Sequence, residues 1–93
     1  MIRSFRHKGL QRFFETGSTA GVQAAHGKRL TMILAALDTA TSVEDLQAVR
    51  KLRLHSLKGQ EAGRLSVWVN GNWRITFEFH ELDVYVLDYE DYH

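Results

Sequence analysis

The strongest constraint on the fold is an alternation of apolar residues with period two in the last third of the chain. Apolar side chains recur at every second position in three runs, at 65–69, 73–79 and 84–86. This period is typical of strands that bury one face. Gly71 lies between two asparagines, and glycine tolerates the positive φ angle that a tight hairpin loop needs. With a second turn near 80–83, the sequence predicts antiparallel strands joined by two hairpins.

Helical spacing dominates the first half of the chain. Leu10, Phe13 and Phe14 recur at i, i+3 and i+4, and Gly17 follows as a residue suited to the end of a helix. A second apolar stripe runs through residues 19–40, which are rich in Ala and Leu, and predicts a longer helix. The members of this stripe are Val22, His26, Leu30, Ile33, Leu34 and Leu37.

These elements combine into one expected architecture. Residues 2–5 alternate enough to predict a short first strand, and Ser42 followed by Asp45 predicts a short N-capped turn after the second helix. The expected order is β α α β β β β, an α+β fold with two N-terminal helices packed on a mainly antiparallel, twisted sheet. Because the 93 residues contain no repeat, low-complexity tract or linker, we expect a single domain over 1–93.

Composition excludes several classes of protein. The chain has no cysteine, so a disulfide framework, a thiolate zinc site and a cysteine nucleophile are excluded. The longest apolar run, 32–37, is too short for a membrane span and the first residues lack a signal-peptide pattern, so a soluble cytoplasmic protein without a membrane partner is expected. No ligand set of the HExxH kind occurs, and neither a metal nor another cofactor is expected.

Charge is nearly balanced in total but uneven along the chain. Of the 12 Lys and Arg residues, all but Arg74 lie in residues 1–64, whereas six of the 11 acids lie in 65–93. A fold that gathers the basic residues would present a strongly positive surface to a polyanion. The candidates are Arg50, Lys51, Arg53, Lys58, Arg64 and Arg74. The alternative is an ordinary solvated basic segment.

Residues able to carry chemistry fall on the polar side of the predicted sheet. Across the tight turn, Arg74 and its alternate neighbours lie beside Ser66 and Trp68, and the chain ends in Asp-Tyr-His. Histidine and tyrosine beside lysine and arginine can cleave RNA without a metal: a base removes the 2′-OH proton, a cation stabilises the phosphorane-like charge, and an acid protonates the leaving 5′-oxygen.

Each of these residue types also has an ordinary structural explanation. His26 lies on the apolar helical stripe and is expected to be a packing residue, and His7 and His80 are expected to be solvated. Trp73 shares the parity of the core-facing residues, so Trp68 is the tryptophan that could stack on a base. The terminal residues need the last strand to hold them in place.

Four segments together resemble the HigB toxins of the RelE/ParE superfamily of toxin–antitoxin systems. They are MIRSFRHKGLQRFFETG at the start, LHSLKG at 54–59, NWRITFEF at 72–79 and YEDYH at 89–93. The resemblance implies a RelE-like microbial RNase fold and a ribosome-dependent mRNA interferase that cleaves mRNA in the A site of the 70S ribosome. It also implies neutralisation by a HigA-type helix-turn-helix antitoxin, with operator DNA bound only through the antitoxin complex.

The resemblance places the family's active site on six residues of this chain. They are His55, Lys58, Arg74, Asp91, Tyr92 and His93. We expect His93 to be the main proton-transfer group and His55 a second proton carrier or a substrate orienter. Lys58 and Arg74 would be the phosphate and transition-state cations. Asp91 would orient a histidine or base, and Tyr92 would stack on or align the nucleotide.

Further contacts to RNA are expected from the basic segment and one tryptophan. The candidates are Arg50, Lys51, Arg53, Arg64 and Trp68. The chain departs from the family pattern after Gly63, where Arg64 replaces a frequent aromatic residue, so Arg64 is expected to add phosphate affinity. Two alternatives remain open: a ParE-like poison of DNA gyrase, and a catalytically silent module that binds an antitoxin and helps repress its own operon.

Overall fold

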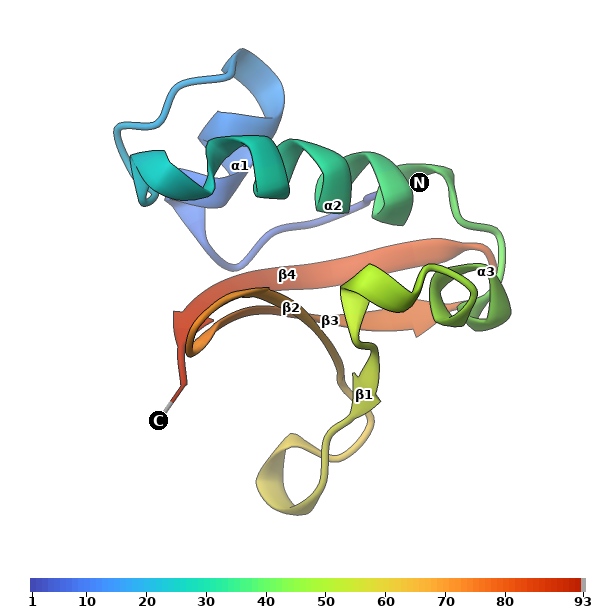
Figure 1. Cartoon of the computed structure of the whole chain (residues 1–93). Coiled ribbons are helices and arrows are strands. Elements are labelled where there is room, and N and C mark those ends of the chain that lie inside the picture. The colour runs from blue at the N-terminus through green and yellow to red at the C-terminus, as the bar shows by residue number, and fades with distance from the viewer. Residues whose placement is uncertain (93) are drawn as a thin grey trace.

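The structure is a computed structural model that describes residues 1–92. Its helices are α1 (Lys8–Thr16), α2 (Gly27–Thr39) and α3 (Val43–Gln47), and its strands are β1 (His55–Ser56), β2 (Leu65–Asn70), β3 (Trp73–His80) and β4 (Asp83–Asp91). The strands form one antiparallel sheet in chain order, and α1 and α2 lie on one of its faces (Figure 1). The predicted α+β class is confirmed. None of the described helices is both long and apolar enough to cross a membrane.

Local signals explain the bounds of α1. The Nδ1 atom of His7 accepts a hydrogen bond from the Leu10 amide at 2.9 Å and so caps the helix N-terminus. Gly17 ends the helix with a φ of 79°, and its amide donates to the Phe13 carbonyl. The predicted helix end is confirmed. His7 was expected to be solvated, but it is partly buried because it serves as the cap.

Helix α2 begins later than the apolar stripe predicts. The prediction of a helix from residue 19 is wrong: a loop leads into a 3₁₀ helix, η1 (Ala24–His26), and α2 starts only at Gly27. The loop passes so close to α1 that a Cβ atom on Gly9 would lie 2.3 Å from the Gly21 carbonyl oxygen. Two backbones can touch in this way only where side chains are absent, and the chain turns at this contact instead of continuing as a helix.

The first predicted strand, at residues 2–5, does not form as a strand. The segment makes two isolated parallel bridges with β4, at Ile2 and Phe5. The ladder is interrupted because β4 bulges at Val86, whose φ is 53°. The Val86 amide donates to the Ser4 hydroxyl at 2.8 Å instead of to a backbone carbonyl.

Alternate residues of the sheet face the helices and form the core. Ile75 and Phe77 of β3 are fully buried, as the period-two pattern predicts. Helix α2 contributes four buried side chains, Leu30, Ile33, Leu34 and Leu37. Each side chain of this kind stabilises the fold by about 1.5–3 kcal/mol relative to an exposed one.

The connections around the sheet are short. The β2–β3 turn has Gly71 at a φ of 56°, and Asn70 pairs with Trp73 across it, as predicted for a tight hairpin. The predicted capped turn at Ser42 begins α3, since its hydroxyl accepts from the Asp45 amide at 3.2 Å. The segment after α3 contains two further 3₁₀ helices, η2 (Arg50–Leu52) and η3 (Gly59–Glu61).

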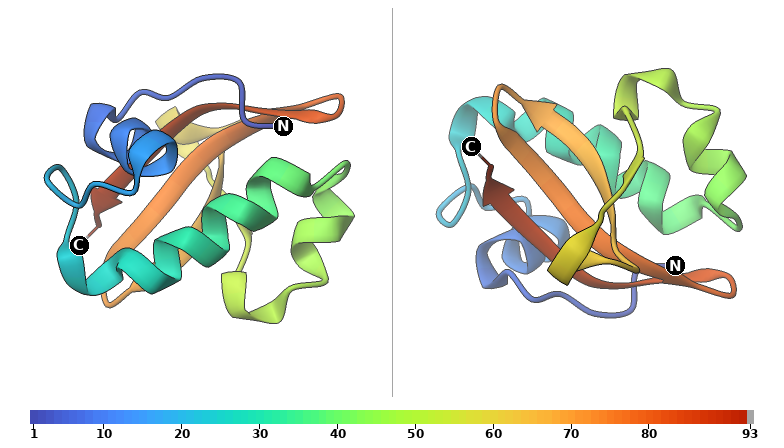
Figure 2. Two further views of the ribbon diagram at one scale, coloured as in Figure 1. Left: turned by 90° about the horizontal axis from the view of Figure 1, so that it is seen from above. Right: turned by 90° about the horizontal axis from the view of Figure 1, so that it is seen from below.

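The sheet face opposite α1 and α2 carries two rows of residues set by the strand register. One row crosses all four strands through His55, Ser66, Thr76 and Asp88. The neighbouring row consists of Trp68, Arg74 and Glu90. Cross-strand partners lie on the same face. In the view from below, this face lies in front of the helices, and the yellow 57–64 loop crosses it (Figure 2).

Candidate active site

An open pocket of about 460 Å³ lies on this face, at the end of the sheet where the β2–β3 turn meets the C-terminal end of β4. Five residues predicted from the sequence line it: His55, Arg74, Tyr92, Arg53 and Trp68. They come from β1, β3, the residue after β4, the segment after η2, and β2. The fold therefore brings together residues that are up to 39 positions apart in the chain.

Glu90 and Tyr92 define the orientation of Arg74 at the pocket. The Nε atom of Arg74 donates to Oε1 of Glu90 at 2.8 Å, and its Nη2 atom lies 2.7 Å from the same oxygen. Its guanidinium also lies 4.2 Å from the ring centroid of Tyr92. The Tyr92 amide in turn donates to the Asn72 carbonyl at 2.6 Å, which ties the C-terminal segment to the hairpin turn. Arg74 thus keeps a positive charge in a fixed direction at the pocket.

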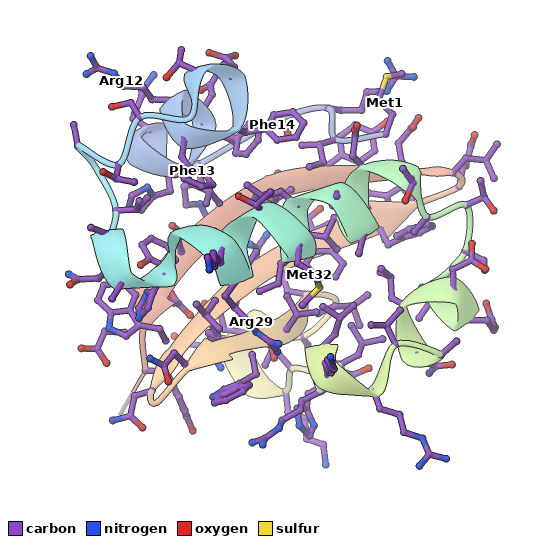
Figure 3. All side chains as sticks on the ribbon, turned by 45° about the horizontal axis from the view of Figure 1, so that its top comes forward. Met1, Arg12, Phe13, Phe14, Arg29 and Met32 are labelled. Carbon is purple, nitrogen blue, oxygen red and sulfur yellow. The ribbon has the colours of Figure 1, made fainter. Side chains whose placement is uncertain are left out.

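Trp68 forms a pocket wall together with two arginines. The Arg53 guanidinium lies 4.1 Å from the ring centroid of Trp68, and that of Arg29 lies at 5.1 Å. The indole nitrogen donates to the Gly71 carbonyl at 2.9 Å. Arg29 reaches from α2 toward the sheet, where it donates to the carbonyls of Trp68 and Lys51 (Figure 3). The ring is therefore fixed, and a positive charge lies over it.

Buried aromatic residues support Trp73, which also lines the pocket. Its ring lies 4.5 Å from that of Tyr89, and the Tyr89 hydroxyl lies 2.6 Å from Nδ1 of His26. Because this hydroxyl accepts from the Gln23 amide at 3.3 Å, we assign it as donor to His26. Burial lowers the pKa of His26 and raises the pKa of Tyr89, which favours this neutral pair. His26 is 5% exposed, as expected for a packing residue.

His55, the predicted second proton carrier, and Lys58, a predicted phosphate-binding cation, lie in different surroundings. His55 is exposed in the two-residue strand β1 and pairs with Ser66 of β2. Lys58 does not line the pocket; it is exposed in the 57–64 loop, immediately before η3. The sheet register fixes His55, whereas the loop conformation determines where Lys58 lies.

The end of the chain is described only in part. Asp91 is the last residue of β4, pairs with Trp73 and is exposed. Tyr92 follows and lines the pocket. The predicted proton-transfer residue His93 lies outside the described residues.

The predicted RNA-binding residues separate into three groups. Arg53 and Trp68 line the pocket. Arg50 and Lys51 of η2 shortly precede Arg53 in the chain and are exposed, but they do not line the pocket. Arg64 corrects the prediction, because it is 7% exposed and its guanidinium contacts other protein groups instead of solvent. Arg64 therefore places a cation inside the protein.

Sequence reasoning did not assign four residues to the site. Asn72 and Trp73 line the pocket, although the parity of Trp73 predicts a core-facing residue, Glu90 holds Arg74, and Arg29 holds the Trp68 strand. Strand register would have identified Glu90, since it is the direct partner of Arg74. Asn72 stands within the NWRITFEF motif. Nothing in the sequence indicates a role for Arg29, because its contact with the Trp68 carbonyl depends on how α2 crosses the sheet.

The uneven charge along the chain is partly explained by contacts between its two ends. Asp83 in β4 lies 3.4 Å from the N-terminal ammonium and 3.2 Å from Nε of Arg3. Asp88 lies 3.7 Å from Arg6. Acidic residues of the last strand thus neutralise basic residues of the N-terminal segment. Among the residues described, no three His, Asp or Glu side chains are placed to hold a metal ion.

Two comparisons with known proteins bear on the identity of the chain. Residues 3–93 match the family model of HigB-like toxins, the RelE-like toxins of type II toxin–antitoxin systems. The chain is also 50% identical over 93 residues to the endoribonuclease HigB of Proteus vulgaris, with both proteins covered over their full lengths. Family membership follows from either match. This chain belongs to the HigB-like family of RelE-like toxins of type II toxin–antitoxin systems.

Proposed function

We propose that this protein is an endoribonuclease toxin that cleaves mRNA in the ribosomal A site without a metal ion or cofactor and thereby inhibits translation. The observation that carries the proposal is the pocket that gathers His55, Arg74 and Tyr92 with Arg53 and Trp68. It combines a titratable ring, oriented cations and aromatic surfaces, which are the groups that positioning and cleavage of a single-stranded RNA require. The relative from Proteus vulgaris is named an endoribonuclease, which agrees with this function.

The proposed reaction is an attack of the ribose 2′-oxygen on the adjacent phosphorus. The bond from phosphorus to the 5′-oxygen breaks, and the products are a 2′,3′-cyclic phosphate and a 5′-hydroxyl. His93 acts as the main proton-transfer group and His55 as the second, one taking the 2′-OH proton and the other supplying the proton to the 5′-oxygen. Arg74 and Lys58 stabilise the charge that develops on the phosphate oxygens.

The remaining site residues bind and align the RNA. Tyr92 stacks on or aligns a nucleotide, and Asp91 orients a histidine. Arg53 and Trp68 present one charged and aromatic wall on which a base can stack. The exposed Arg50 and Lys51 extend the positive surface toward phosphates of mRNA and rRNA.

The family implies a protein partner as well as a substrate. We propose that a HigA-type helix-turn-helix antitoxin neutralises the toxin in the cytoplasm, and that operator DNA is bound only through that complex. A copurification of the two coexpressed chains, followed by an operator binding assay with and without the antitoxin, tests this. Operator binding by the toxin alone would contradict it.

The activity is tested on purified 70S ribosomes programmed with mRNA of defined A-site codons. Wild-type protein that has been treated with EDTA and then desalted should cut the mRNA on intact ribosomes, and should not do so when ribosomes are omitted. His93→Ala and Arg74→Gln should each lower the cleavage rate by about 10²- to 10⁴-fold. Arg12→Gln is the matched control for Arg74→Gln, since this arginine is exposed on α1, away from the pocket.

Each result bears on a different part of the proposal. Loss of cleavage after this EDTA treatment, restored when a divalent metal ion is added back to the desalted protein, would contradict the metal-free reaction. Unchanged cleavage by His93→Ala would remove its proton-transfer role. A folded wild-type protein that cuts no codon would favour gyrase poisoning or a silent antitoxin-binding module.

A further inference from the structure

Among residues 1–92, Arg64 is the one lysine or arginine that is buried, with 7% of its surface exposed. It lies at the end of the 57–64 loop, on the sheet face that carries the pocket, but it does not line the pocket. A buried cation is costly unless nearby groups compensate its charge and accept its hydrogen bonds. The partners of Arg64 therefore indicate what this residue does.

The side chain of Arg64 joins the loop to two strands of the sheet. Nη2 donates to the Thr76 hydroxyl at 2.9 Å and to the Val86 carbonyl at 2.8 Å, and Nη1 donates to Glu78 at 3.3 Å. On the loop side, Nε lies 3.5 Å from the carboxylate of Glu61 in η3. One guanidinium thus connects η3, β3 and the bulge of β4.

The backbone of Arg64 closes the same loop. Its carbonyl accepts from the Leu57 amide at 2.9 Å, and its amide donates to the Glu61 carbonyl at 3.0 Å. The Glu61 amide in turn donates to the Lys58 carbonyl at 3.3 Å. A short chain of hydrogen bonds therefore runs from Arg64 through η3 to Lys58.

Other features of the loop provide little support. Gly59 and Gly63 have φ angles of 68° and 92°, and most side chains of the loop are exposed. The preceding strand β1 has only two residues. A loop with few buried contacts opens easily, so the position of Lys58 depends on the contacts that Arg64 makes.

We infer that Arg64 is a positioning residue, which holds the 57–64 loop against β3 and β4 and thereby sets the position of Lys58 relative to the RNA phosphate. The inference rests on the proposed nuclease function. It replaces the expectation that Arg64 binds phosphate, because the guanidinium is buried, donates to the hydroxyl of Thr76, the carbonyl of Val86 and Glu78, and pairs through Nε with Glu61 by charge alone.

The two roles for Arg64 predict different results for Arg64→Gln. If the residue positions the loop, the cleavage rate at saturating toxin should fall about 10- to 100-fold, which is the cost of a misplaced catalytic group. The salt dependence of ribosome binding should stay unchanged. A direct phosphate contact would instead reduce the slope of log K against log salt by about 0.7. Arg64→Lys, which keeps the charge but not the planar fork, should recover part of the rate.

Hydrogen exchange tests the inference without any use of activity. In Arg64→Gln, the amides of Leu57 and Glu61 should exchange faster, while those in the centre of β3 keep their protection. Glu61→Gln weakens only the loop side of the connection and should accelerate the same amides; it decides the matter if Arg64→Gln does not fold. Arg12→Gln is the charge-matched control, because Arg12 is exposed on α1, and Figure 3 shows it on the outer side of that helix.

The outcomes separate this inference from the proposed function. Unchanged loop exchange in the folded variants, or a reduced salt slope, overturns the positioning role. If Lys58→Gln cleaves at the wild-type rate, the phosphate role of Lys58 fails, and with it the stated purpose of the loop contact. A wild-type protein without nuclease activity refutes the proposed function, while the exchange data still establish or overturn the contact itself.

Discussion

The hydrogen bond between Tyr89 and His26 beneath the pocket should contribute measurably to stability. Tyr89→Phe removes the hydroxyl that lies 2.6 Å from Nδ1 of His26 and accepts from the Gln23 amide. Each lost hydrogen bond costs about 1 kcal/mol, and an unpaired buried ring nitrogen costs about 1–3 kcal/mol. Allowing for overlap between these costs, we expect a loss of about 2 kcal/mol, or about 8–16 °C in Tm for a domain of this size.

A double-mutant cycle isolates this interaction. His26→Leu alone leaves the Tyr89 hydroxyl without its acceptor, whereas the double variant removes both partners. The double variant should therefore lose about 1–2 kcal/mol less than the sum of the two single variants. Urea denaturation measures these free energies of unfolding, provided that the m-values stay equal.

Two results would refute this reasoning. One is additivity of the two substitutions within about 0.5 kcal/mol, which would show that the side chains do not interact. The other is an equal loss for Tyr85→Phe, a partly exposed tyrosine of the same strand that should change stability by less than about 0.5 kcal/mol.

Three further predictions concern the site, the loop contact and pH. Glu90→Gln should lower the rate of RNA cleavage about 10-fold in the ribosome assay, because Arg74 loses the carboxylate that orients it, while the Tm stays within a few degrees. A large drop in Tm together with the loss of rate would show that Glu90 has a structural role only. Gly9→Ala should destabilise the fold by about 1–3 kcal/mol in urea denaturation, because its Cβ atom would lie 2.3 Å from the Gly21 carbonyl oxygen; a wild-type midpoint would contradict this. Burial lowers the pKa of His26 below 6.5, so as the pH falls the unfolded state binds a proton on this residue before the folded state does. The contribution of His26 to the free energy of unfolding is therefore fully present above pH 6.5 and decreases as the pH falls toward the pKa of the folded state. A series of Tm measurements against pH should show this decrease, and His26→Leu should abolish it.

Sequence reasoning identified the elements whose signals are local. The period-two runs gave β2, β3 and the beginning of β4, where the bulge at Val86 then changes which residues are buried. Gly17 marked the end of α1, and Ser42 marked the start of α3. In each case the deciding interaction lies within a few residues or follows from side-chain alternation. Such interactions can be read without knowledge of the tertiary structure.

The errors arose where distant segments decide the local structure. The close contact of Gly9 with Gly21 ends the helical pattern before α2, and no local propensity indicates it. The bulge at Val86 divides the pairing of the N-terminal segment, although a β-branched residue with positive φ is unfavourable. Arg64 appeared to be a surface cation because its partners come from three separate elements.

The sequence predicted which residues form the candidate site better than it predicted how they are held in place. Family motifs indicated His55, Arg74 and Tyr92, which the pocket brings together. The groups that orient them, such as Glu90, follow only from the register of the hairpins. Register depends on turn geometry and bulges, so a single sequence constrains it weakly.

The two margins of the sheet bear on how this toxin can associate with other chains. At one margin, β1 offers only two residues, and at the other the N-terminal segment already occupies β4 at Ile2 and Phe5. Neither margin presents a long row of free backbone groups, the feature that promotes edge-to-edge aggregation. A partner that added a strand beside β4 would first have to displace the N-terminal segment, so protease sensitivity of that segment would report such a mode of recognition.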